Sequence, residues 1–248
     1  MANPEFKDHF SKQAAEYAKF RPRYPKGLFQ WLASVGPSRE LAWDCATGNG
    51  QAAVELAEVF LRVIATDASE KQVANAEQHP RVEYRTATAE NSGLESQGVD
   101  LVTVAQALHW FDLERFYTEV RRVLKPDGAI AVWAYKLATV SPAIDAIVNH
   151  YYSDVVGPHW PAERVLVEKF EELPFAFTEI AVPSFAMEAE WRVENLLGYL
   201  RTWSATQRFM TAEQRDPLDE VEDKLRAEWG TDVRCVVWPL TVRVGRLL

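Results

Sequence analysis

The stretch WDCATGNGQAA, residues 43–53, decides the fold class of this chain. Gly48, Gly50 and Ala53 satisfy the G-x-G-x-x-G/A spacing of a loop that follows a strand and opens a helix. Such loops bind a dinucleotide pyrophosphate or another adenosine-containing cofactor, because residues without a Cβ let the backbone approach the ligand. The spacing alone leaves both kinds of cofactor open.

Strand and helix patterns alternate on both sides of this loop. Strands are predicted at residues 41–45, 62–67, 82–87, 99–105 and 129–135, and helices at residues 51–60, 69–78 and 113–124. The turn KPDG, residues 125–128, separates the last of these helices from the strand that follows. This order predicts βαβ units, and we expect an α/β, Rossmann-like, mostly parallel sheet with helices on both faces.

The alternation loosens after residue 135. Helices are predicted at residues 141–152, 163–172, 193–204 and 211–228, and strands at residues 177–187 and from residue 234 to the end. The terminal strand is expected to pair antiparallel with an earlier one, and Pro239 indicates an edge position or a bulge because proline has no N–H. Two helices, at residues 5–19 and 27–34, precede the core.

These elements suggest three parts of one globular unit. Residues 1–35 are expected to form an N-terminal helical flap, residues 36–138 a cofactor-binding core, and residues 139–248 a helical cover over the substrate together with the terminal strands of the same sheet.

Charge and cysteine content restrict the class of function. A net charge of -9 with no cluster of Lys or Arg argues against a nucleic-acid partner. The longest apolar stretch is too short and interrupted to cross a bilayer, and we expect a cytoplasmic monomer or homodimer with no membrane partner. Cys45 and Cys235 have no C-x-x-C partner, so neither a disulfide nor a metal site is expected.

Two carboxylates at strand ends bear on the identity of the cofactor. Asp44, beside the loop, would repel a pyrophosphate, whereas it favours a ligand with an ammonium and a sulfonium, such as S-adenosylmethionine. Asp67 lies 17 residues beyond Gly50, close to the ~20 expected for an acid that binds a ribose diol. The alternative role for Asp67 is to cap the helix that follows it.

The ends of the next two strands complete the expected site, because ligands of open parallel sheets bind outside the carboxyl ends of the strands. The adenine base is expected near residues 88–90, TAE, with a plain loop as the alternative. Gln106 and His109 follow the fourth strand, and Trp110 provides a flat apolar wall. A structural role is the alternative for His109.

The series DCATGNG at 44–50, Asp67, TAE at 88–90 and ALHWF at 107–111 resembles the class I S-adenosylmethionine-dependent methyltransferases, in particular the methyltransferase type 11 group. Four further segments are similar to those of the trans-aconitate methyltransferase-like branch: RPRYP at 21–25, GPHW at 157–160, RTWSA at 201–205 and VVW at 236–238. The resemblance covers nearly the whole chain. It departs at Ala46, in place of the first loop glycine, where the methyl group either crowds the backbone or requires less extreme dihedral angles.

The resemblance implies a seven-stranded sheet whose last strand runs antiparallel, with S-adenosyl-L-methionine as the cofactor. It implies that the methionine part meets the loop, the ribose Asp67, the adenine Ala68 and the TAE turn, the sulfonium side Gln106, and that a flap tyrosine covers the cofactor. The cofactor-binding residues so implied are Tyr24, Asp44, Ala46, Thr47, Gly48, Gly50, Asp67, Ala68, Thr88, Ala89, Glu90 and Gln106.

The chemistry of methyl transfer sets the expectations for the substrate. Transfer from a sulfonium is an in-line displacement, so the protein mainly aligns the reacting atoms and excludes water. A carboxylate acceptor, as the branch resemblance implies, needs no base and is held by cations, for which the candidates are Arg21, Arg23 and Arg201. A hydroxyl or amine acceptor requires a base, and His109 is then the catalytic candidate.

Aromatic residues complete the expected substrate pocket. Trp110, Trp160 and Trp203 are expected to contact the acceptor, and core packing is the alternative for Trp160, Trp203 and Trp238. We therefore expect a methyltransferase that O-methylates a small carboxylic acid. The rivals are an NAD(P)-dependent oxidoreductase, disfavoured by Asp44 and the missing Tyr-x-x-x-Lys pattern, and a noncatalytic cofactor-binding or scaffold protein.

Overall fold

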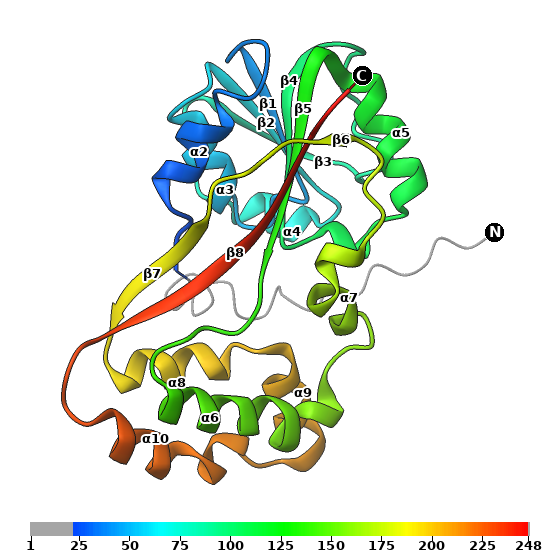
Figure 1. The fold of residues 1–248 in the computed structure, drawn as a ribbon. Coiled ribbons are helices and arrows are strands. Elements are labelled where there is room, and N and C mark those ends of the chain that lie inside the picture. The colour runs from blue at the N-terminus through cyan, green and yellow to red at the C-terminus, as the bar shows by residue number, and fades with distance from the viewer. Residues whose placement is uncertain (1–21, 248) are drawn as a thin grey trace.

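A single sheet organises the computed structural model, which describes residues 22–247. Within that range the sheet has eight strands: seven follow the order β3-β2-β1-β4-β5-β8-β6, and β7 pairs with β8 (Figure 1). The strands are β1 Leu41–Cys45, β2 Arg62–Asp67, β3 Val82–Thr86, β4 Val99–Ala105, β5 Leu124–Tyr135, β6 Thr178–Glu179, β7 Phe185–Trp191 and β8 Arg234–Arg246. β1 to β5 are parallel, whereas β8 runs antiparallel to β5, which confirms the expected Rossmann-like architecture.

The helices lie on both faces of this sheet and beyond one of its ends. They are α2 Lys26–Leu32, α3 Gln51–Ala57, α4 Glu70–Ala74, α5 Leu113–Val123, α6 Pro142–His150, α7 Arg164–Glu168, α8 Val193–Arg201, α9 Ser204–Glu213 and α10 Glu222–Trp229. Short helical turns add η1 Leu108–Trp110, η2 Tyr151–Val155, η3 Gly157–His159, η4 Phe170–Glu172 and η5 Pro217–Glu220. The expected helix at 5–19 and Arg21 lie outside the described residues.

Strand β5 shows how the two faces are filled. Ala131 and Trp133 point to the face covered by α2 and α3, whereas Ile130 and Val132 point to the face covered by α5. All four side chains are fully buried, because successive residues of a strand face opposite sides and both sides are covered here. This is why the strand reads as a nearly continuous apolar run.

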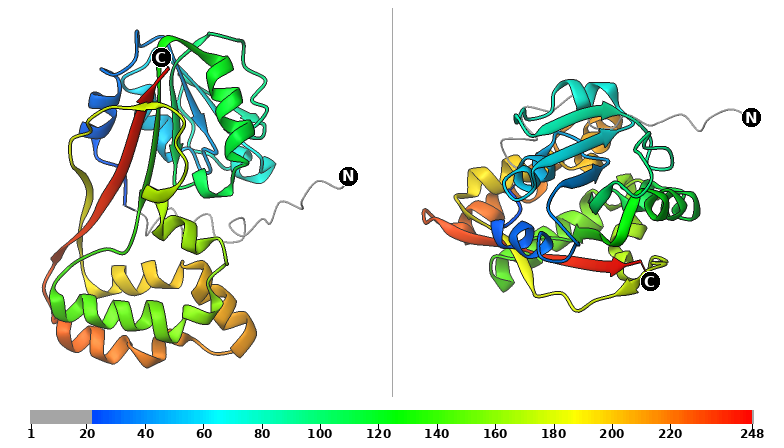
Figure 2. Two further views of the ribbon diagram at one scale, coloured as in Figure 1. Left: turned by 45° about the vertical axis from the view of Figure 1, so that its right-hand side comes forward. Right: turned by 90° about the horizontal axis from the view of Figure 1, so that it is seen from above.

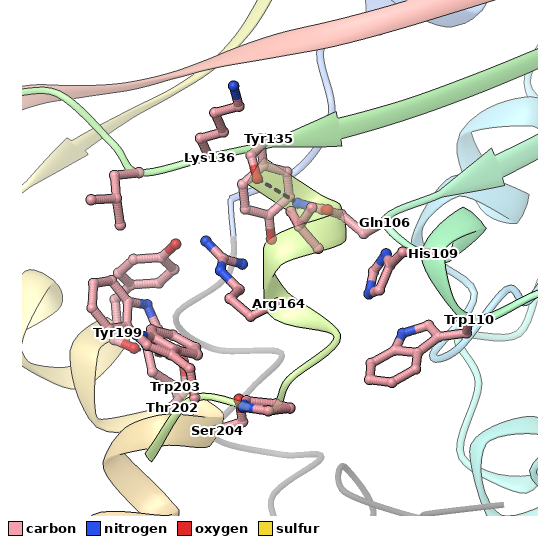
Figure 3. A pocket seen from close by; sticks show the side chains of 14 residues that line it. Gln106, His109, Trp110, Tyr135, Lys136, Arg164, Tyr199, Thr202, Trp203 and Ser204 are labelled. Atoms are coloured by element: carbon pink, nitrogen blue, oxygen red, sulfur yellow. Dashed lines mark hydrogen bonds between the residues drawn. The ribbon is translucent and has the colours of Figure 1, made fainter. Parts of the chain in front are cut away.

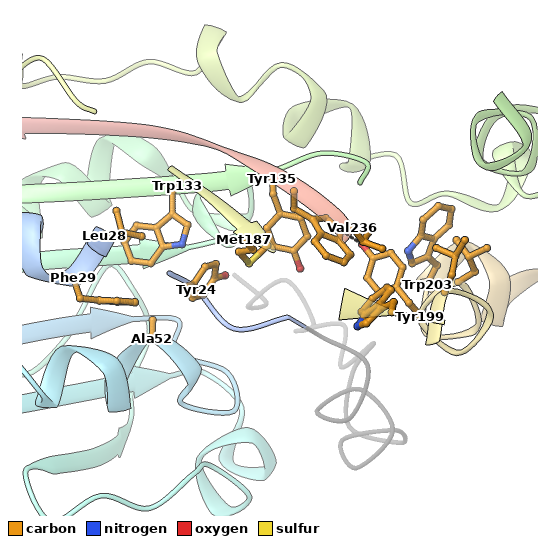
Figure 4. Close-up of a cluster of buried hydrophobic side chains, with 14 of the residues drawn as sticks. Tyr24, Leu28, Phe29, Ala52, Trp133, Tyr135, Met187, Tyr199, Trp203 and Val236 are labelled. Carbon is orange, nitrogen blue, oxygen red and sulfur yellow. Dashed lines mark hydrogen bonds between the residues drawn. The ribbon is translucent and has the colours of Figure 1, made fainter. Parts of the chain in front are cut away.

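The helical cover, formed by α6, α8, α9 and α10, lies beyond the end of the sheet at which β5 leads into α6 (Figures 1 and 2). β7 and β8 extend from the sheet toward these helices. One hydrophobic cluster joins the two parts, since it runs from Phe29 through Trp133 and Tyr135 to Tyr199 and Trp203 (Figure 4). The cover is therefore packed onto the core.

The structure corrects several expected boundaries. The strand expected at 177–187 is divided into β6 and β7, so the sheet has eight strands and not seven. The helix expected at 211–228 is interrupted after α9 by Gln214, whose φ is 54°, and by Pro217, which cannot continue a helix. The KPDG turn lies in a bulge at the start of β5, between the pairs Val99–Leu124 and Leu101–Ala129.

The structure also shows the positions of Pro239 and of helix α2, about which the sequence led to expectations. Pro239 pairs with Ala186 of β7, where pairing with β5 has already stopped at Leu240, so its missing N–H interrupts no pair with β5. Helix α2, which lies within the flap expected at 1–35, belongs to the core, with Leu28, Phe29 and Leu32 almost fully buried, whereas residues 1–21 lie outside the described part of the chain.

Within residues 22–247, no helix has the length and apolar character needed to cross a bilayer. The same part of the chain holds no group of His, Cys, Asp and Glu side chains arranged to bind a metal ion.

Candidate functional site

The loop between β1 and α3 has the open backbone that a ligand requires. Ala46, Gly48 and Gly50 all have positive φ angles, of 56°, 57° and 84°. A Cβ at Gly48 would meet no atom of residues 22–247 within 4 Å, whereas a Cβ at Gly50 would collide with the Tyr84 hydroxyl. The space beside Gly48 is therefore available to a ligand, and only Gly50 is required by the protein's own packing.

Ala46 adopts a left-handed conformation in spite of its Cβ. This conformation costs a residue other than glycine about 1–2 kcal/mol. The alternative of less extreme dihedral angles at this position is therefore wrong.

Asp44 is a buried carboxylate without a cationic partner among the described residues. Its side chain is 1% exposed and accepts hydrogen bonds from the hydroxyls of Thr47, at 2.5 Å, and Thr103, at 2.8 Å. Burial raises the pKa of Asp44 to about 6, against the opposing effect of these two hydroxyls. A positively charged ligand group would offset the free-energy cost of burying the ionised carboxylate. An ammonium group is expected in this role from the sequence.

Asp67, at the end of β2, accepts hydrogen bonds from two backbone N–H groups, each at 2.9 Å. Gly48 N–H donates to Oδ2 and Ser69 N–H donates to Oδ1. The cap of α4 is the Ser69 hydroxyl, which accepts from Gln72 N–H, so the alternative role of Asp67 as a cap does not hold. The acid ties the loop to the end of β2.

The segments expected around the adenine lie at the neighbouring strand ends. Ala87 N–H donates to the Asp67 carbonyl at 3.0 Å, which joins the end of β3 to that of β2. Beyond it, Thr88 forms an isolated bridge with Asn91, Ala89 is buried, and the Glu90 carboxylate accepts from Asp112 N–H at 3.1 Å. Ala68 is exposed beside Asp67.

A second space lies between the core and the helical cover (Figure 3). The cavity encloses about 130 Å³. It is lined by Gln106, His109, Trp110, Tyr135, Lys136, Leu137, Trp160, Pro161, Arg164, Val167, Tyr199, Thr202, Trp203 and Ser204.

Five residues singled out from the sequence meet in this cavity: Gln106, His109, Trp110, Trp160 and Trp203. Gln106 connects it to the sheet, because its backbone N–H donates to the Trp133 carbonyl at 2.9 Å and its side-chain amide donates to the Tyr135 carbonyl at 3.0 Å. Gln106, which follows β4, has a φ of 56°, so it is left-handed like Ala46, which follows β1.

His109 is uncharged at neutral pH. Burial, together with the positive charge of Arg164, lowers its pKa from 6.5 to about 4, against the opposing effect of Glu163. The ring contacts that of Trp110, with centroids 4.7 Å apart and the ring planes tilted by 44°. Because a base with a pKa near 4 is weak at neutral pH, this environment favours an acceptor that needs no deprotonation.

Arg164 of α7 is the cation that sequence reasoning missed. Its guanidinium stacks on Trp160 at 4.9 Å and on Tyr152 at 5.4 Å, and Nε donates to the Tyr152 hydroxyl at 3.0 Å. The Tyr152 hydroxyl in turn bonds the Glu168 carboxylate. No carboxylate among residues 22–247 forms an ion pair with Arg164, and Figure 3 shows the guanidinium in the middle of the cavity.

Two of the three arginines named from the sequence, Arg23 and Arg201, form ion pairs outside the cavity, and the third, Arg21, lies outside the described residues. Arg23 forms ion pairs with Glu77, at 2.8 Å, and Glu55, at 3.7 Å. Arg201 pairs with two carboxylates of the cover, Asp216 at 3.2 Å and Glu222 at 3.4 Å, and does not line the cavity. Among the described arginines, the candidate cation is therefore Arg164 and not Arg201. Of the RTWSA segment at 201–205, the residues that line the cavity are Thr202, Trp203 and Ser204.

Two remaining aromatic residues are part of the hydrophobic core. Trp238 is fully buried, and its indole N–H donates to the Tyr199 hydroxyl at 3.3 Å, so the core-packing alternative holds for it. Tyr24 packs its ring 5.5 Å from that of Trp133. The segment that carries Tyr24 lies beside the cofactor loop, since the Gln51 amide donates to the Pro22 carbonyl at 3.3 Å.

Comparison with known proteins agrees with this geometry. The model of a methyltransferase domain family matches residues 43–132, the part that contains the loop, Asp67 and Gln106. A protein of Dictyostelium discoideum that is named as a methyltransferase is 34% identical over 232 residues, covering 92% of this chain and 88% of the relative.

A solved structure from Anaeromyxobacter dehalogenans, described as a type II methyltransferase, is 45% identical. It superposes with a TM-score of 0.87 and covers 92% of this chain and 98% of its own. A methyltransferase-named protein of Schizosaccharomyces pombe is 27% identical over 90% of both chains. The loop, the buried acids and these relatives together establish that the chain belongs to the S-adenosylmethionine-dependent methyltransferases.

Proposed function

We propose that this methyltransferase transfers the methyl group of S-adenosylmethionine to the carboxylate of a small-molecule acid, giving a methyl ester. The observation that carries the proposal is Arg164, a guanidinium inside the aromatic cavity that has no carboxylate partner among the described residues. A planar guanidinium binds a carboxylate through two parallel hydrogen bonds, so Arg164 suits an acid better than an amine.

The cofactor would lie along the carboxyl ends of β1 to β4. Asp44 would face its ammonium, Asp67 its ribose diol, residues 88–90 its adenine, and Gln106 its sulfonium side. When bound, S-adenosylmethionine supplies a methyl group on a positively charged sulfur that leaves as a neutral thioether. The open space beside Gly48 and the buried charge of Asp44 both support this arrangement.

The protein's own residues then act by binding and orientation. Arg164 holds the acceptor carboxylate and keeps it ionised, while the surrounding tryptophans exclude water from it. An ionised carboxylate would accept the methyl group without loss of a proton, so the site would need no general base. His109 has no proton to remove in this reaction, in agreement with its low pKa.

We also propose that the chain belongs to the trans-aconitate methyltransferase-like branch of the family. Its support is that two of the branch segments, at 157–160 and 201–205, supply Trp160 and Trp203 to the cavity. A cytoplasmic location is proposed as well, and the free thiols of Cys45 and Cys235 suit a reducing compartment.

The test is methyl transfer from S-adenosylmethionine to a panel of small organic acids, amines and alcohols, with detection of S-adenosylhomocysteine and of the methylated product. We expect methyl esters, and at least a thirtyfold rise in the KM for the acid in Arg164→Gln. The matched control is Arg215→Gln, because Arg215 also stacks on an aromatic ring, that of Phe209 at 4.7 Å, but lies outside the cavity. Exclusive methylation of amines or alcohols would contradict the proposal.

A further inference from the structure

We infer that Tyr152 is a positioning residue for the acceptor: its hydroxyl orients Arg164 and keeps Glu168 from pairing with it. This inference rests on the proposed function, because it explains how Arg164 remains available to an acceptor carboxylate. Neither Tyr152 nor Glu168 lines the cavity, so both would act through Arg164.

The spacing of Arg164 and Glu168 makes the lack of an ion pair between them informative. They are the first and last residues of α7, four positions apart. Residues at this spacing are neighbours on one face of a helix, and an arginine and a glutamate so placed commonly form an ion pair. Among residues 22–247, however, neither side chain takes part in an ion pair. Something must therefore separate the two charges.

The Tyr152 hydroxyl lies between the two side chains. It accepts a hydrogen bond from Arg164 Nε at 3.0 Å and donates one to the Glu168 carboxylate. Burial raises the pKa of Tyr152, so the hydroxyl keeps its proton at neutral pH and can donate. The hydrogen bond from Nε restricts the direction of the guanidinium and leaves Nη1 and Nη2 for the two oxygens of an acceptor carboxylate.

The ring and the backbone of Tyr152 support the same orientation. Arg164 Cζ lies 5.4 Å from the centroid of this ring and 4.9 Å from that of Trp160, and the two ring centroids are 4.9 Å apart. The Tyr152 carbonyl accepts a hydrogen bond from the Trp160 indole N–H at 3.1 Å, so the second ring is held by the same residue. Hydroxyl, ring and carbonyl of Tyr152 thus together determine where the guanidinium lies.

Tyr152 belongs to η2, a π-helical turn that continues α6. Val156 N–H donates to the Tyr151 carbonyl at 3.0 Å, which closes a turn wider than that of an α-helix. Tyr151 is fully buried, with its hydroxyl 2.9 Å from that of Thr206, whereas the next residue, Tyr152, contacts Arg164. Single π-helical turns in helices are frequent at functional sites, and here the turn carries the residue that orients Arg164.

The test measures methyl transfer from S-adenosylmethionine to trans-aconitate, or to whichever acid of the panel above is methylated fastest, by Tyr152→Phe, Glu168→Gln and the double variant. Tyr152→Phe keeps the ring and removes only the hydroxyl, so Glu168 becomes free to pair with Arg164 and to compete with the acceptor. We expect the KM for the acid to rise about tenfold, with kcat and the Kd for S-adenosylmethionine within about twofold of the wild type.

Glu168→Gln removes the competing charge and keeps an acceptor for the Tyr152 hydroxyl, so its KM should stay within about twofold of the wild-type value. In the double variant no carboxylate competes, and KM should be about threefold lower than in Tyr152→Phe. A purely structural role of Tyr152 does not predict this rescue. The matched control is Tyr117→Phe, whose KM should not change, because the Tyr117 hydroxyl donates to the Pro174 carbonyl at 2.7 Å, outside the cavity.

A measurement that does not depend on turnover follows the exchange of the Arg164 Nε–H with solvent in the free protein, by nuclear magnetic resonance with Arg164→Gln for assignment. Loss of the bond to Tyr152 should make this exchange about tenfold faster in Tyr152→Phe. Unchanged exchange together with an unchanged KM, or a double variant with a KM no lower than that of Tyr152→Phe, would overturn the inference and leave the proposed function intact. Methylation of amines or alcohols alone would overturn the proposed function and, with it, the role of Arg164 toward an acid.

Discussion

Replacement of Asp44 by Asn should stabilise the free protein and weaken its binding of S-adenosylmethionine. The carboxylate is almost completely buried, and burial raises its pKa from 3.8 to about 6. The folded chain therefore binds this proton more tightly than the unfolded chain. The resulting stabilisation is complete below pH 3.8 and is lost as the pH rises through about 6.

The magnitude follows from the pKa. Ionised Asp44 costs the folded protein up to about 3 kcal/mol at neutral pH. Asn resembles the protonated acid, and its amide can hydrogen-bond the hydroxyls of Thr47 and Thr103. Removal of the charge should raise Tm by roughly 5–10 °C in a chain of this size. The loss of one charge-assisted interaction with the ligand ammonium corresponds to ~2 kcal/mol, or about thirtyfold in Kd.

The assay is differential scanning fluorimetry of both proteins at pH 5.0 and pH 7.5, with calorimetric titration of the cofactor at both values. The difference in Tm should be large at pH 7.5 and small at pH 5.0, where Asp44 is mostly protonated in the wild type. Wild-type affinity for the cofactor should fall as the pH drops below 6, because the proton competes with the ligand ammonium.

The matched control is Asp100→Asn. Asp100 is fully buried as well, but hydrogen bonds from Ser38 and the Leu41 N–H and an ion pair with Lys125 outweigh the effect of burial and lower its pKa. Its replacement should therefore destabilise the protein at pH 7.5. A Tm for Asp44→Asn at or below that of the wild type, with unchanged cofactor affinity, would refute the role given to Asp44.

Three further changes test the site. Asp67→Ala should weaken cofactor binding more than tenfold, because each hydrogen bond to a charged group contributes ~1.5–3 kcal/mol; an unchanged Kd in calorimetry would remove the ribose assignment. Ala46→Gly should stabilise the protein by about 0.5 kcal/mol in urea unfolding, because Ala46 has a φ of 56°; a loss of stability would mean that chain entropy outweighs the strain. His109→Gln should lower kcat for a carboxylate acceptor less than tenfold, with a pH profile that stays flat from 6 to 8; a hundredfold loss would identify His109 as a base.

The strands and the cofactor loop could be predicted from local patterns. β1, β2 and β4 begin and end at the predicted residues, because an apolar run bounded by turn residues is a local property of the chain. The left-handed turns at Gly48 and Gly50 follow from the lack of a Cβ, and Asp44 and Asp67 follow from their places at strand ends.

The substrate side could not be predicted in the same way. His109, Trp160 and Trp203 were expected in the site, but they are brought together with Arg164 only by the packing of the helical cover on the core. Arg201 and Arg164 have the same guanidinium group, and no local sequence pattern shows which carboxylate or ligand either of them binds.

The sequence by itself determined the class of fold, the cofactor loop and the two buried acids, because these depend on residues close together in the chain. The tertiary structure decided which arginine faces the cavity. Arg201 meets Asp216 and Glu222 across the helices of the cover, whereas Arg164 is held against Trp160 and Tyr152. Charge pairing between distant segments, which local patterns do not encode, thus leaves Arg164 as the group that can bind an acid.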